Sequence, residues 1–385
     1  MKFLITVASY YPVSGGVQMV TQYTAEELVK RGHKVTIITS NSDRSDERVE
    51  HNGVKLLYTD VFKKADFTKG DKKAYRELLL SQVKDKDVLI NVSLQTPTTD
   101  LVLPLLPLIK CKKILYLHDI YDFTWRKDDK KNLKSIVKKL YYNCTRRYYY
   151  SYVYKYIKDY NLITHLSPFD ISMRYVKKHG IKQNLVLGNA ALDSVFAAKH
   201  DKIQDDPYFI CIANYNDRKN QLFVLESFYN ADLTQNVKLV FIGKEENAYY
   251  KKLVARKNEL DRISGPRNVD FYAGISRDKT EFLLSNASAL VLGSTVEMFP
   301  VVIIEAMASK IPFISTEVGC VKYQPGGFIA KDSDEMSYWM KFIIDNPNVA
   351  QSYGLAGYEF ATKNMTVESR VDLLLNSINY LSDNA

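Results

Sequence analysis

The chain has 385 residues, of which 46% are hydrophobic and 25% charged, which excludes a disordered protein and allows two domains that each have a hydrophobic core. The formal net charge of +9, from 53 Lys and Arg against 44 Asp and Glu, favours an anionic partner such as a diphosphate, a lipid head group or a nucleic acid. We expect no nucleic acid, because the basic residues are spread along the chain without a nucleic-acid-binding motif.

The N-terminal half alternates short apolar strands with helices. The first expected strand, 2–9, is too short for the apolar region of a signal peptide, and a loop (10–16) and a helix (17–30) follow it. No apolar run approaches the length of a membrane span. Further strands are expected at 34–39, 88–92, 113–117 and 162–166. This alternation predicts a doubly wound α/β sheet with right-handed connections.

The loop after the first strand contains the glycine pair Gly15-Gly16. Paired glycines let the backbone approach a ligand closely, where any side chain would clash. The alternative is a tight turn that requires positive φ angles and binds nothing. A second candidate position is His118, which follows the strand at 113–117 on the side where doubly wound folds bind ligands. A histidine that only caps the strand is the alternative, and the residues do not separate the two.

Residues 134–160 are unusually rich in Lys, Arg and Tyr. In the first half of this segment, apolar and basic side chains separate onto different arcs of a helix, as in helices that lie on a membrane surface. The apolar arc is Leu133, Ile136, Val137, Leu140, Tyr141 and Cys144, and the basic residues elsewhere are Lys134, Lys138, Lys139 and Arg146. Tyrosine favours the boundary between water and lipid. The alternative is a helix packed on the sheet, which the fold requires before the strand at 162–166.

A polar stretch, 197–207, separates this half from a second alternating series. The expected strands of this series are 208–213, 238–242, 269–273, 287–292 and 312–315, and the expected helices are 221–230, 248–260, 278–286 and 301–309. The first loop of the series carries Arg218 and Lys219, cations that could neutralise a diphosphate leaving group. A basic pair in a loop is usually only solvated, and its place after a strand distinguishes this one. Gly243 is a further candidate by the same position.

The most informative segment runs from Glu297 to Pro312. A buried strand and a loop precede a helix, with Pro300 expected in the first turn of that helix. The backbone N–H groups around Phe299 and Val301 would then be free to hold an anion. Glu297 lies before this anion site, and Glu305 lies one turn after Val301 on the same face. Carboxylates beside a phosphate site suit the vicinal hydroxyls of a sugar, which predicts a nucleotide-sugar site.

This Pro-x4-Glu-Ala-Met-Ala segment resembles the retaining family-4 glycosyltransferases, whose fold, called GT-B, has two Rossmann-like domains facing a central cleft. The resemblance implies that Glu297 contacts the donor sugar and Glu305 the nucleotide ribose. The segment 268–276, with Ile275, looks like the strand and turn that hold the nucleobase. The resemblance covers essentially the whole chain, as an acceptor-binding domain at 1–196, a nucleotide-sugar-binding domain at 197–365, and a final helix within 366–385 that crosses back onto the first domain.

The resemblance also gives roles to the other candidates. Gly15 and Gly16 would face the donor phosphate, Lys219 would bind the diphosphate, and His118 would contact the donor sugar or the acceptor. The chain departs from the usual pattern at several positions. Asn214 stands where the family usually has the second diphosphate-binding arginine, and Arg218 is the candidate substitute. Gln18, Met298 and Lys310 stand where a glutamate and two glycines are frequent.

We therefore expect a retaining, metal-independent glycosyltransferase that needs no cofactor and moves a sugar from a nucleotide-diphosphate donor, with UDP as the nucleotide, to a saccharide. A lipid-linked acceptor in bacterial envelope polysaccharide assembly is expected. Four scattered cysteines without metal-binding spacing indicate a reducing cytoplasm, at the inner face of the membrane if the basic helix binds it. Two other classes stay open: a non-catalytic nucleotide-sugar-binding partner, and a phosphorylase or epimerase of the same architecture. The residues themselves do not identify the donor base, the sugar, the acceptor or the oligomeric state.

Overall fold

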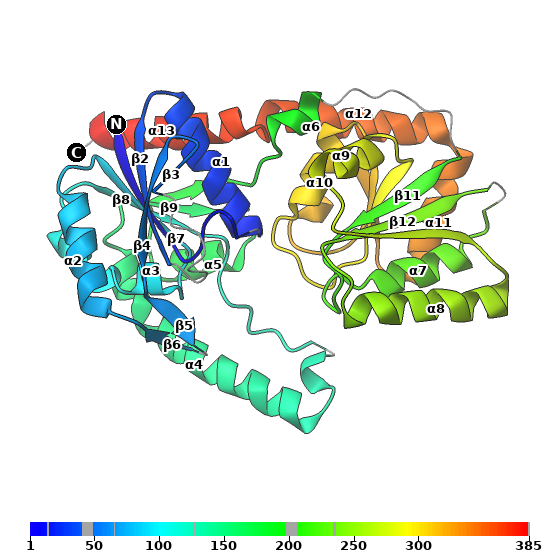
Figure 1. The fold of residues 1–385 in the computed structure, drawn as a ribbon, viewed down its shortest axis with the longest axis horizontal. Coiled ribbons are helices and arrows are strands. Elements are labelled where there is room, and N and C mark those ends of the chain that lie inside the picture. Colours follow the sequence, from blue (N-terminus) through cyan, green and yellow to red (C-terminus); the bar gives the residue numbers. More distant parts are fainter. Residues whose placement is uncertain are drawn as a thin grey trace. The chain divides into compact units, whose positions relative to one another are not determined.

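The computed structural model describes residues 1–13, 15–40, 49–64, 66–126, 128–197, 206–233 and 236–383. The chain forms two compact units, each with its own sheet and helices (Figure 1). The first unit consists of residues 1–188 together with 371–385, and the second consists of residues 189–370. Within the described part of the chain, none of the helices combines the length and the apolar character that crossing a bilayer requires.

The first unit is built on an eight-stranded sheet in the order β10-β9-β8-β7-β1-β2-β4-β3, parallel except for the β3–β4 pair. Its strands are β1 (Lys2–Val7), β2 (Lys34–Ser40), β3 (Glu50–His51), β4 (Val54–Thr59), β7 (Val88–Val92), β8 (Lys112–Tyr116), β9 (Leu162–His165) and β10 (Asn184–Val186), and a separate hairpin joins β5 (Phe62–Lys64) to β6 (Phe67–Lys69). Its helices are α1 (Gly16–Lys30), α2 (Lys72–Val83), α3 (Pro97–Asp100), α4 (Leu133–Ile157) and α5 (Ile171–Lys178), with short 3-10 turns at Leu103–Leu108 and Asp128–Lys130.

The second unit is built on a six-stranded parallel sheet in the order β13-β12-β11-β14-β15-β16. Its strands are β11 (Tyr208–Ile212), β12 (Lys238–Gly243), β13 (Asn268–Ala273), β14 (Ala289–Leu292), β15 (Phe313–Thr316) and β16 (Gly327–Ala330). Its helices are α6 (Asp193–Ala197), α7 (Gln221–Asn230), α8 (Ala248–Ser264), α9 (Arg277–Ser285), α10 (Val301–Ala308), α11 (Ser333–Asp345) and α12 (Pro347–Asn364), with a 3-10 turn at Val321–Tyr323.

Apolar side chains cover both faces of this second sheet, which is why its strands read as continuous apolar runs. On one face Phe228 of α7 and Leu253 of α8 pack with Met336 and Met340 of α11. On the other face α10 packs through Ile303 and its neighbours. The two separate cores confirm the doubly wound arrangement that the alternating pattern predicts.

The boundary between the units lies earlier in the chain than the predicted one at 196. Ala191 pairs with Thr366 in an isolated parallel bridge, and Ala191 and Val195 are buried in the core of the second unit. These contacts place residues from Asn189 onward in that unit. Most of the predicted polar linker, 198–205, lies outside the described residues.

The last helix, α13 (Val367–Asp383), begins in the second unit, and its residues from Val371 onward belong to the first. Val371, Leu374 and Ile378 are buried. The Arg31 guanidinium donates to Asp372 at 2.5 Å, and the Lys112 amine donates to the carbonyl of Ile378 at 3.0 Å. Burial of an apolar stripe and two polar contacts therefore attach α13 to the first unit.

Candidate donor-binding site

The candidate site of the second unit is built on the carboxyl ends of β11 and β14, which are neighbours in the sheet. The loop after β11 and the loop after β14 therefore lie side by side. They are joined through the carbonyl of Arg218, which accepts from the N–H of Thr295 at 2.8 Å and from its hydroxyl at 3.2 Å. These bonds fix the position of the β14 loop against the β11 loop.

Two predicted residues from these loops come together. The Lys219 amine forms an ion pair with Oε1 of Glu297, and the hydroxyl of Ser294 donates to the same oxygen at 2.7 Å. Both charged side chains are mostly buried, with 18% of Lys219 and 11% of Glu297 exposed. Attraction between charges is stronger in such partly dehydrated surroundings than at the surface. The pair therefore holds a cation and a carboxylate in fixed positions at the edge of the sheet.

The neighbouring cation, Arg218, has an exposed side chain, and so does Asn214. Lys219 is turned inward because the loop closes on itself. Its N–H bonds to the carbonyl and the side-chain oxygen of Asn216, and Asn220 adopts the left-handed conformation at φ 51° just before α7. The loop thus presents only one of its two adjacent cations to the carboxylate.

The start of α10 differs slightly from the prediction. Pro300 does not lie in the first turn; it is the N-cap residue, with extended backbone, and the helix begins at Val301. The shift follows from the loop, where Asn189 donates to the carbonyl of Phe299 at 2.8 Å. The N–H groups of Val301 and Val302 still lack acceptors within the helix, as at every helix start, whereas that of Ile303 donates to the carbonyl of Pro300 at 3.2 Å. The predicted anion position therefore remains at Val301, one residue after the proline.

Close backbone packing supports the Glu297–Met298 segment from behind. The N–H of Cys320 donates to the carbonyl of Met298 at 3.2 Å. Gly319 has a φ of 51°, and a Cβ atom there would clash with the carbonyl oxygens of Glu297 and Met298. A glycine is therefore required for the chain to approach this segment so closely.

Glu305 has a partner that the sequence analysis missed. The Arg277 guanidinium, at the start of α9, donates through Nη2 to Oε1 of Glu305 at 2.6 Å and through Nε to Oε1 of Glu281, also at 2.6 Å. Burial of this guanidinium acts to lower its pKa, but the attraction and hydrogen bonds of the Glu305 and Glu281 carboxylates together outweigh burial and raise the pKa of Arg277. Only 8% of the Glu305 side chain is exposed, so the guanidinium supplies the charge that this buried carboxylate needs.

Two further candidates lie at the ends of β12 and β13. A Cβ atom at Gly243 would overlap the ring of Tyr215, whose hydroxyl donates to the carbonyl of Tyr272 at 2.8 Å. The packing of the unit thus accounts for this glycine without a ligand. Ile275 is half-buried after Gly274, which has a φ of 65°. Contacts of Gly243 and Ile275 with a donor stay predictions.

Three further predicted residues lie in the first unit. Neither Gly15 nor Gly16 adopts the left-handed conformation: Gly15 has an extended backbone with a φ of 175°, and Gly16 is the first residue of α1. A tight turn with positive φ is therefore not the reason for this glycine pair. A Cβ atom at Gly16 would meet no atom within 4 Å, and one at Gly15 would meet only the flexible end of Gln18. The described contacts therefore do not explain the glycine pair, and its approach to a ligand stays a prediction.

His118 follows β8, as predicted. Its Nε2 atom is buried and has no hydrogen-bond partner among the described residues. Burial lowers the pKa of His118 to about 4, so the imidazole is neutral near pH 7. The next residue, Asp119, has a φ of 73° and accepts from the N–H of Ser172 in α5 at 2.8 Å. This bond fixes the turn that carries the histidine.

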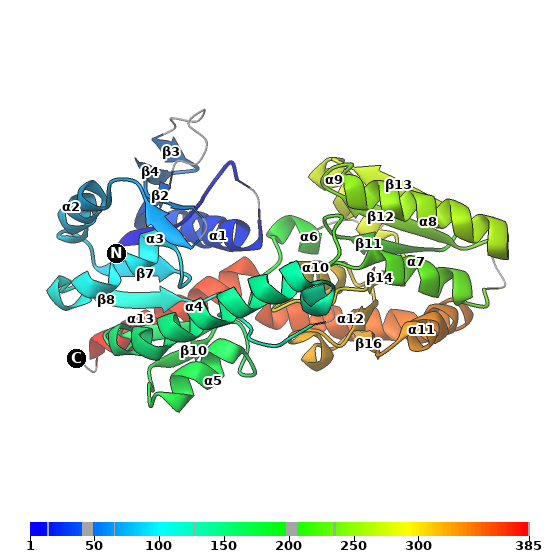
Figure 2. The same cartoon turned by 90° about the horizontal axis from the view of Figure 1, so that it is seen from below.

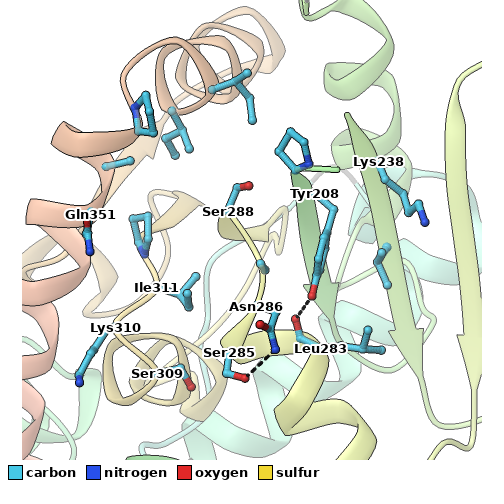
Figure 3. Close-up of a pocket in the computed structure, with 18 of the residues that line it drawn as sticks. Tyr208, Lys238, Leu283, Ser285, Asn286, Ser288, Ser309, Lys310, Ile311 and Gln351 are labelled. Atoms are coloured by element: carbon cyan, nitrogen blue, oxygen red, sulfur yellow. Dashed lines mark hydrogen bonds between the residues drawn. The ribbon is translucent and has the colours of Figure 1, made fainter. Parts of the chain in front are cut away.

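A cavity of about 1190 Å³ in the second unit lies away from these residues (Figure 3). Its lining includes Tyr208 and Lys238, the first residues of β11 and β12, and Ser288 and Pro312, which immediately precede β14 and β15. It therefore opens at the amino ends of the strands. Ligands of doubly wound sheets bind at the carboxyl ends, so this cavity is not the candidate donor site. Within the described ranges, no three His, Cys, Asp or Glu side chains gather in a way that could hold a metal ion.

Several solved structures are similar to essentially the whole chain. A glycosyltransferase from Rickettsia africae has a TM-score of 0.75 at 15% identity, covering 100% of this chain and 99% of its own. Sucrose-phosphate synthase from Thermosynechococcus elongatus has a TM-score of 0.73 at 13% identity, with both chains fully covered. The Anabaena protein HepE, in complex with UDP and glucose, has a TM-score of 0.71 at 13% identity, covering 99% of this chain and 100% of its own. These likenesses confirm the predicted GT-B fold.

Two family models match successive parts of the chain. Residues 14–161 match the model described as Glycosyltransferase Family 4, and residues 194–348 match the model described as Glycosyl transferases group 1. The chain is a GT-B glycosyltransferase. An uncharacterised 42.6 kDa protein in the cps region of Klebsiella pneumoniae is 36% identical over 59 residues, which is 15% of this chain and 16% of that protein.

The residues that the sequence analysis missed in this glycosyltransferase are Arg277 and Ser294. Arg277 follows the 268–276 segment, and its spacing of four residues from Glu281 is visible in the sequence. Its second partner, Glu305, lies 28 residues further on, so only the fold reveals the pairing. Ser294 lies three residues before Glu297, and its hydroxyl could have been anticipated as a loop contact.

A first prediction separates Glu305 from its neighbour Glu281. If Glu305 binds the ribose, it contributes equally to ground state and transition state, so Glu305→Ala should raise the donor KM with little change in kcat. Hydrogen bonds to a charged group contribute about 1.5–3 kcal/mol, so their loss should raise the donor KM roughly 10- to 150-fold. Glu281→Ala is the matched control, because Glu281 binds the same guanidinium and has no proposed donor contact. Steady-state kinetics in which both variants raise KM equally would assign the effect to Arg277.

A second prediction concerns acid stability. A histidine whose pKa is near 6.5 when unfolded and about 4 when folded binds more protons in the unfolded state between these pH values. Its contribution to the free energy of unfolding is therefore lost as the pH falls from about 6.5 to about 4. Between pH 7.5 and pH 5, the Tm of the His118→Gln variant should therefore fall by less than the Tm of wild type. Thermal unfolding with the same Tm decrease in both proteins would contradict the burial of this imidazole.

Proposed function

We propose that this glycosyltransferase is a retaining enzyme that transfers a sugar from a nucleotide-diphosphate sugar, with UDP as the nucleotide, to a saccharide acceptor. The observation that carries the proposal is the mostly buried Lys219–Glu297 pair beside the start of α10. It offers a cation and free backbone N–H groups to a diphosphate, and a carboxylate to a sugar. The complex of the similar HepE protein with UDP and glucose supports the choice of UDP.

In this proposal the residues of the second unit divide the donor between them. Lys219 and the start of α10, at Phe299, Pro300 and Val301, meet the negative charge that gathers on the leaving diphosphate. Glu297 orients the sugar. Glu305, held by Arg277, binds the ribose. Gly15, Gly16 and His118 are proposed as further contacts from the first unit, and Asn214, Arg218, Gly243 and Ile275 as outer contacts of the donor.

Retention of configuration is proposed without a covalent intermediate. Glu297, the one carboxylate proposed to touch the sugar, is engaged through Oε1 by Lys219 and Ser294. This arrangement suits a role in orientation better than nucleophilic attack. Front-face attack by the acceptor, assisted by the departing phosphate, then remains as the route to retention.

A third prediction follows from the charges around the diphosphate. Because Lys219 and the start of α10 meet the leaving-group charge, no metal is proposed in the reaction, in contrast to enzymes that use a divalent ion for this purpose. Excess EDTA should leave the transfer rate within about twofold of the untreated rate. A rate that collapses with EDTA and returns with added Mg²⁺ or Mn²⁺ would contradict this assignment.

The acceptor is proposed to be lipid-linked, in the assembly of bacterial envelope polysaccharide at the inner face of the cell membrane. Two comparisons support this choice. The Klebsiella relative is a protein of a cps region, and a lipopolysaccharide outer core galactosyltransferase, WaaB, shares the fold. The positive net charge of +9 also favours an anionic lipid surface.

The test of the proposed function is a panel of nucleotide sugars, with release of nucleoside diphosphate and the formation of a glycosylated product as readouts. We expect one UDP-sugar to be turned over with an added saccharide acceptor and to be hydrolysed slowly without it. Asn214 favours one competing function, because it lacks the charge of the usual arginine: a partner protein that binds the donor without turnover. Donor binding with no detectable hydrolysis or transfer across the panel would establish that alternative.

A further inference from the structure

The long helix α4 of the first unit has two halves with different surroundings. In its second half Tyr150, Val153 and Ile157 are buried in the core beneath the sheet. This half satisfies the need of the fold for a packed helix before β9. The first half extends past the sheet of its own unit in both views (Figures 1 and 2). The packing of α4 therefore does not explain the apolar residues of its first half.

Those apolar residues are exposed. The exposed fractions are 75% for Leu133, 56% for Val137, 49% for Leu140, 46% for Tyr141 and 74% for Tyr148, and Cys144 is exposed as well. Their spacing of three or four residues places them on one side of the helix. We call this set the α4 stripe. A continuous exposed apolar stripe of this kind marks a binding surface more often than an ordinary water-facing surface.

Basic side chains border the α4 stripe. At 100° per residue, Lys134 and Lys138 follow one edge of the stripe and Arg147 lies at the other, and all three are exposed. Lys139 and Arg146 are not part of this surface, because they turn inward and pair with Asp129 and Asp66. The sequence contains no Asp or Glu between residues 130 and 158. The stripe is therefore apolar at its centre and positive at its edges.

This chemistry selects among the partners that could cover the stripe. A second copy of the chain would bring like charges together at both edges, which disfavours association. A nucleic acid would use the charges but leave the aliphatic centre in water. An anionic lipid surface uses both, since the apolar side chains enter the boundary of the acyl chains, lysines reach the head groups and tyrosines favour the interface.

We propose that the α4 stripe docks the transferase on an anionic lipid surface, with the first half of α4 lying in the plane of the interface. The inference rests on the proposed function in one respect: the proposed lipid-linked acceptor is the reason that the enzyme would need to bind a membrane. The exposed side chains themselves supply the binding. Because part of the attraction is electrostatic, binding weakens as salt screens it.

Co-sedimentation with vesicles tests the proposal. The protein is expected to bind vesicles of phosphatidylcholine mixed with phosphatidylglycerol at low salt, to bind less as salt rises, and to bind vesicles of phosphatidylcholine alone much more weakly. Lys134→Glu with Lys138→Glu should lower the partition coefficient at least 25-fold, since each lysine near the surface contributes roughly fivefold. Leu133→Ser with Val137→Ser and Leu140→Ser should lower it at least tenfold.

The matched control is Ile263→Ser with Tyr338→Ser, which removes exposed apolar side chains from the second unit and should leave binding unchanged. No binding of wild type to anionic vesicles at low salt, or equal binding by the stripe variants, would overturn the proposal. A dimer in solution that the stripe variants convert to monomers would overturn it as well.

Hydrolysis of the donor in water is measured on the same proteins. It should not change in the stripe variants, and its absence in wild type with vesicle binding intact would reject the proposed function but not the docking surface.

Discussion

Lys219→Ala is expected to lower kcat by roughly 100-fold or more, the loss found when one preorganised stabiliser of transition-state charge is removed. Lys219 is mostly buried and already fixed against Glu297, so its charge is in position before the donor binds. Charge on the diphosphate grows as the glycosidic bond breaks, and the amine therefore stabilises the transition state more than the ground state. Donor KM should change much less than kcat.

The adjacent cation provides the control for this variant. Arg218 is exposed, and an exposed charge contributes about 0.2–1 kcal/mol, so Arg218→Ala should change kcat by no more than about fivefold. Steady-state kinetics on the best donor of the panel decide between the two residues. A larger loss for Arg218→Ala than for Lys219→Ala would mean that the outer cation, and not the buried one, meets the diphosphate.

Glu297→Gln is expected to lower kcat by roughly 100-fold as well, for a different reason. A sugar that is no longer oriented loses the near-attack geometry on which rapid transfer depends. The substitution also breaks the ion pair with Lys219, which frees the amine to interact with a phosphate. UDP should therefore bind this variant as tightly as wild type, or more tightly.

Ser294→Ala tests whether the orientation of Glu297 matters. It removes the 2.7 Å hydrogen bond to Oε1 and keeps the charge. A hydrogen bond to a charged group contributes about 1.5–3 kcal/mol, and Lys219 still holds the same oxygen, so kcat should fall by the lower end of this range, roughly 10-fold. Unchanged kcat in both Glu297→Gln and Ser294→Ala would remove Glu297 from the sugar-binding role. Thermal unfolding of each variant checks that a lower rate does not come from a partly unfolded protein.

Much of the fold is predictable from the sequence because parallel strands buried on both faces appear as short apolar runs. The helix predicted at 221–230 and the strand predicted at 88–92 occur with those bounds. Short or polar strands escape this pattern. The three-residue β10 contains Asn184, and β16 begins at Gly327, whose missing Cβ leaves room for the ring of Phe313. Such strands depend on packing against neighbours and have little signal of their own.

The individual residues of the candidate site can be predicted from the sequence, but the contacts between them cannot. Lys219 and Glu297 are 78 residues apart, and they meet because the chain places β14 beside β11. Nothing local in either loop specifies that order of strands. The hydrogen bond from the guanidinium of Arg277 to Glu305 is a second case, since it joins the first residue of α9 to the middle of α10, two helices that the sheet topology brings together. Long-range pairs of this kind require the topology, which residue spacing does not provide.

The amphipathic helix shows a different limit. The sequence pattern of α4 fits both a packed helix and a membrane-bound helix, and each half of the helix meets one of these descriptions. Val153 is buried, whereas Val137 is exposed. The same residue type and the same periodicity therefore occur in both halves. The two halves of α4 can be distinguished only from the structure, which shows where the helix extends beyond the sheet.

The measurement that tests the central assignment most directly is calorimetric titration of UDP into wild type, Glu297→Gln and Glu305→Ala. If Glu305 binds the ribose and Glu297 only the sugar, UDP affinity falls roughly 10- to 150-fold in Glu305→Ala and stays at the wild-type value, or rises, in Glu297→Gln. A large loss of affinity in Glu297→Gln, with Glu305→Ala unchanged, would contradict the account and exchange the roles of the two carboxylates.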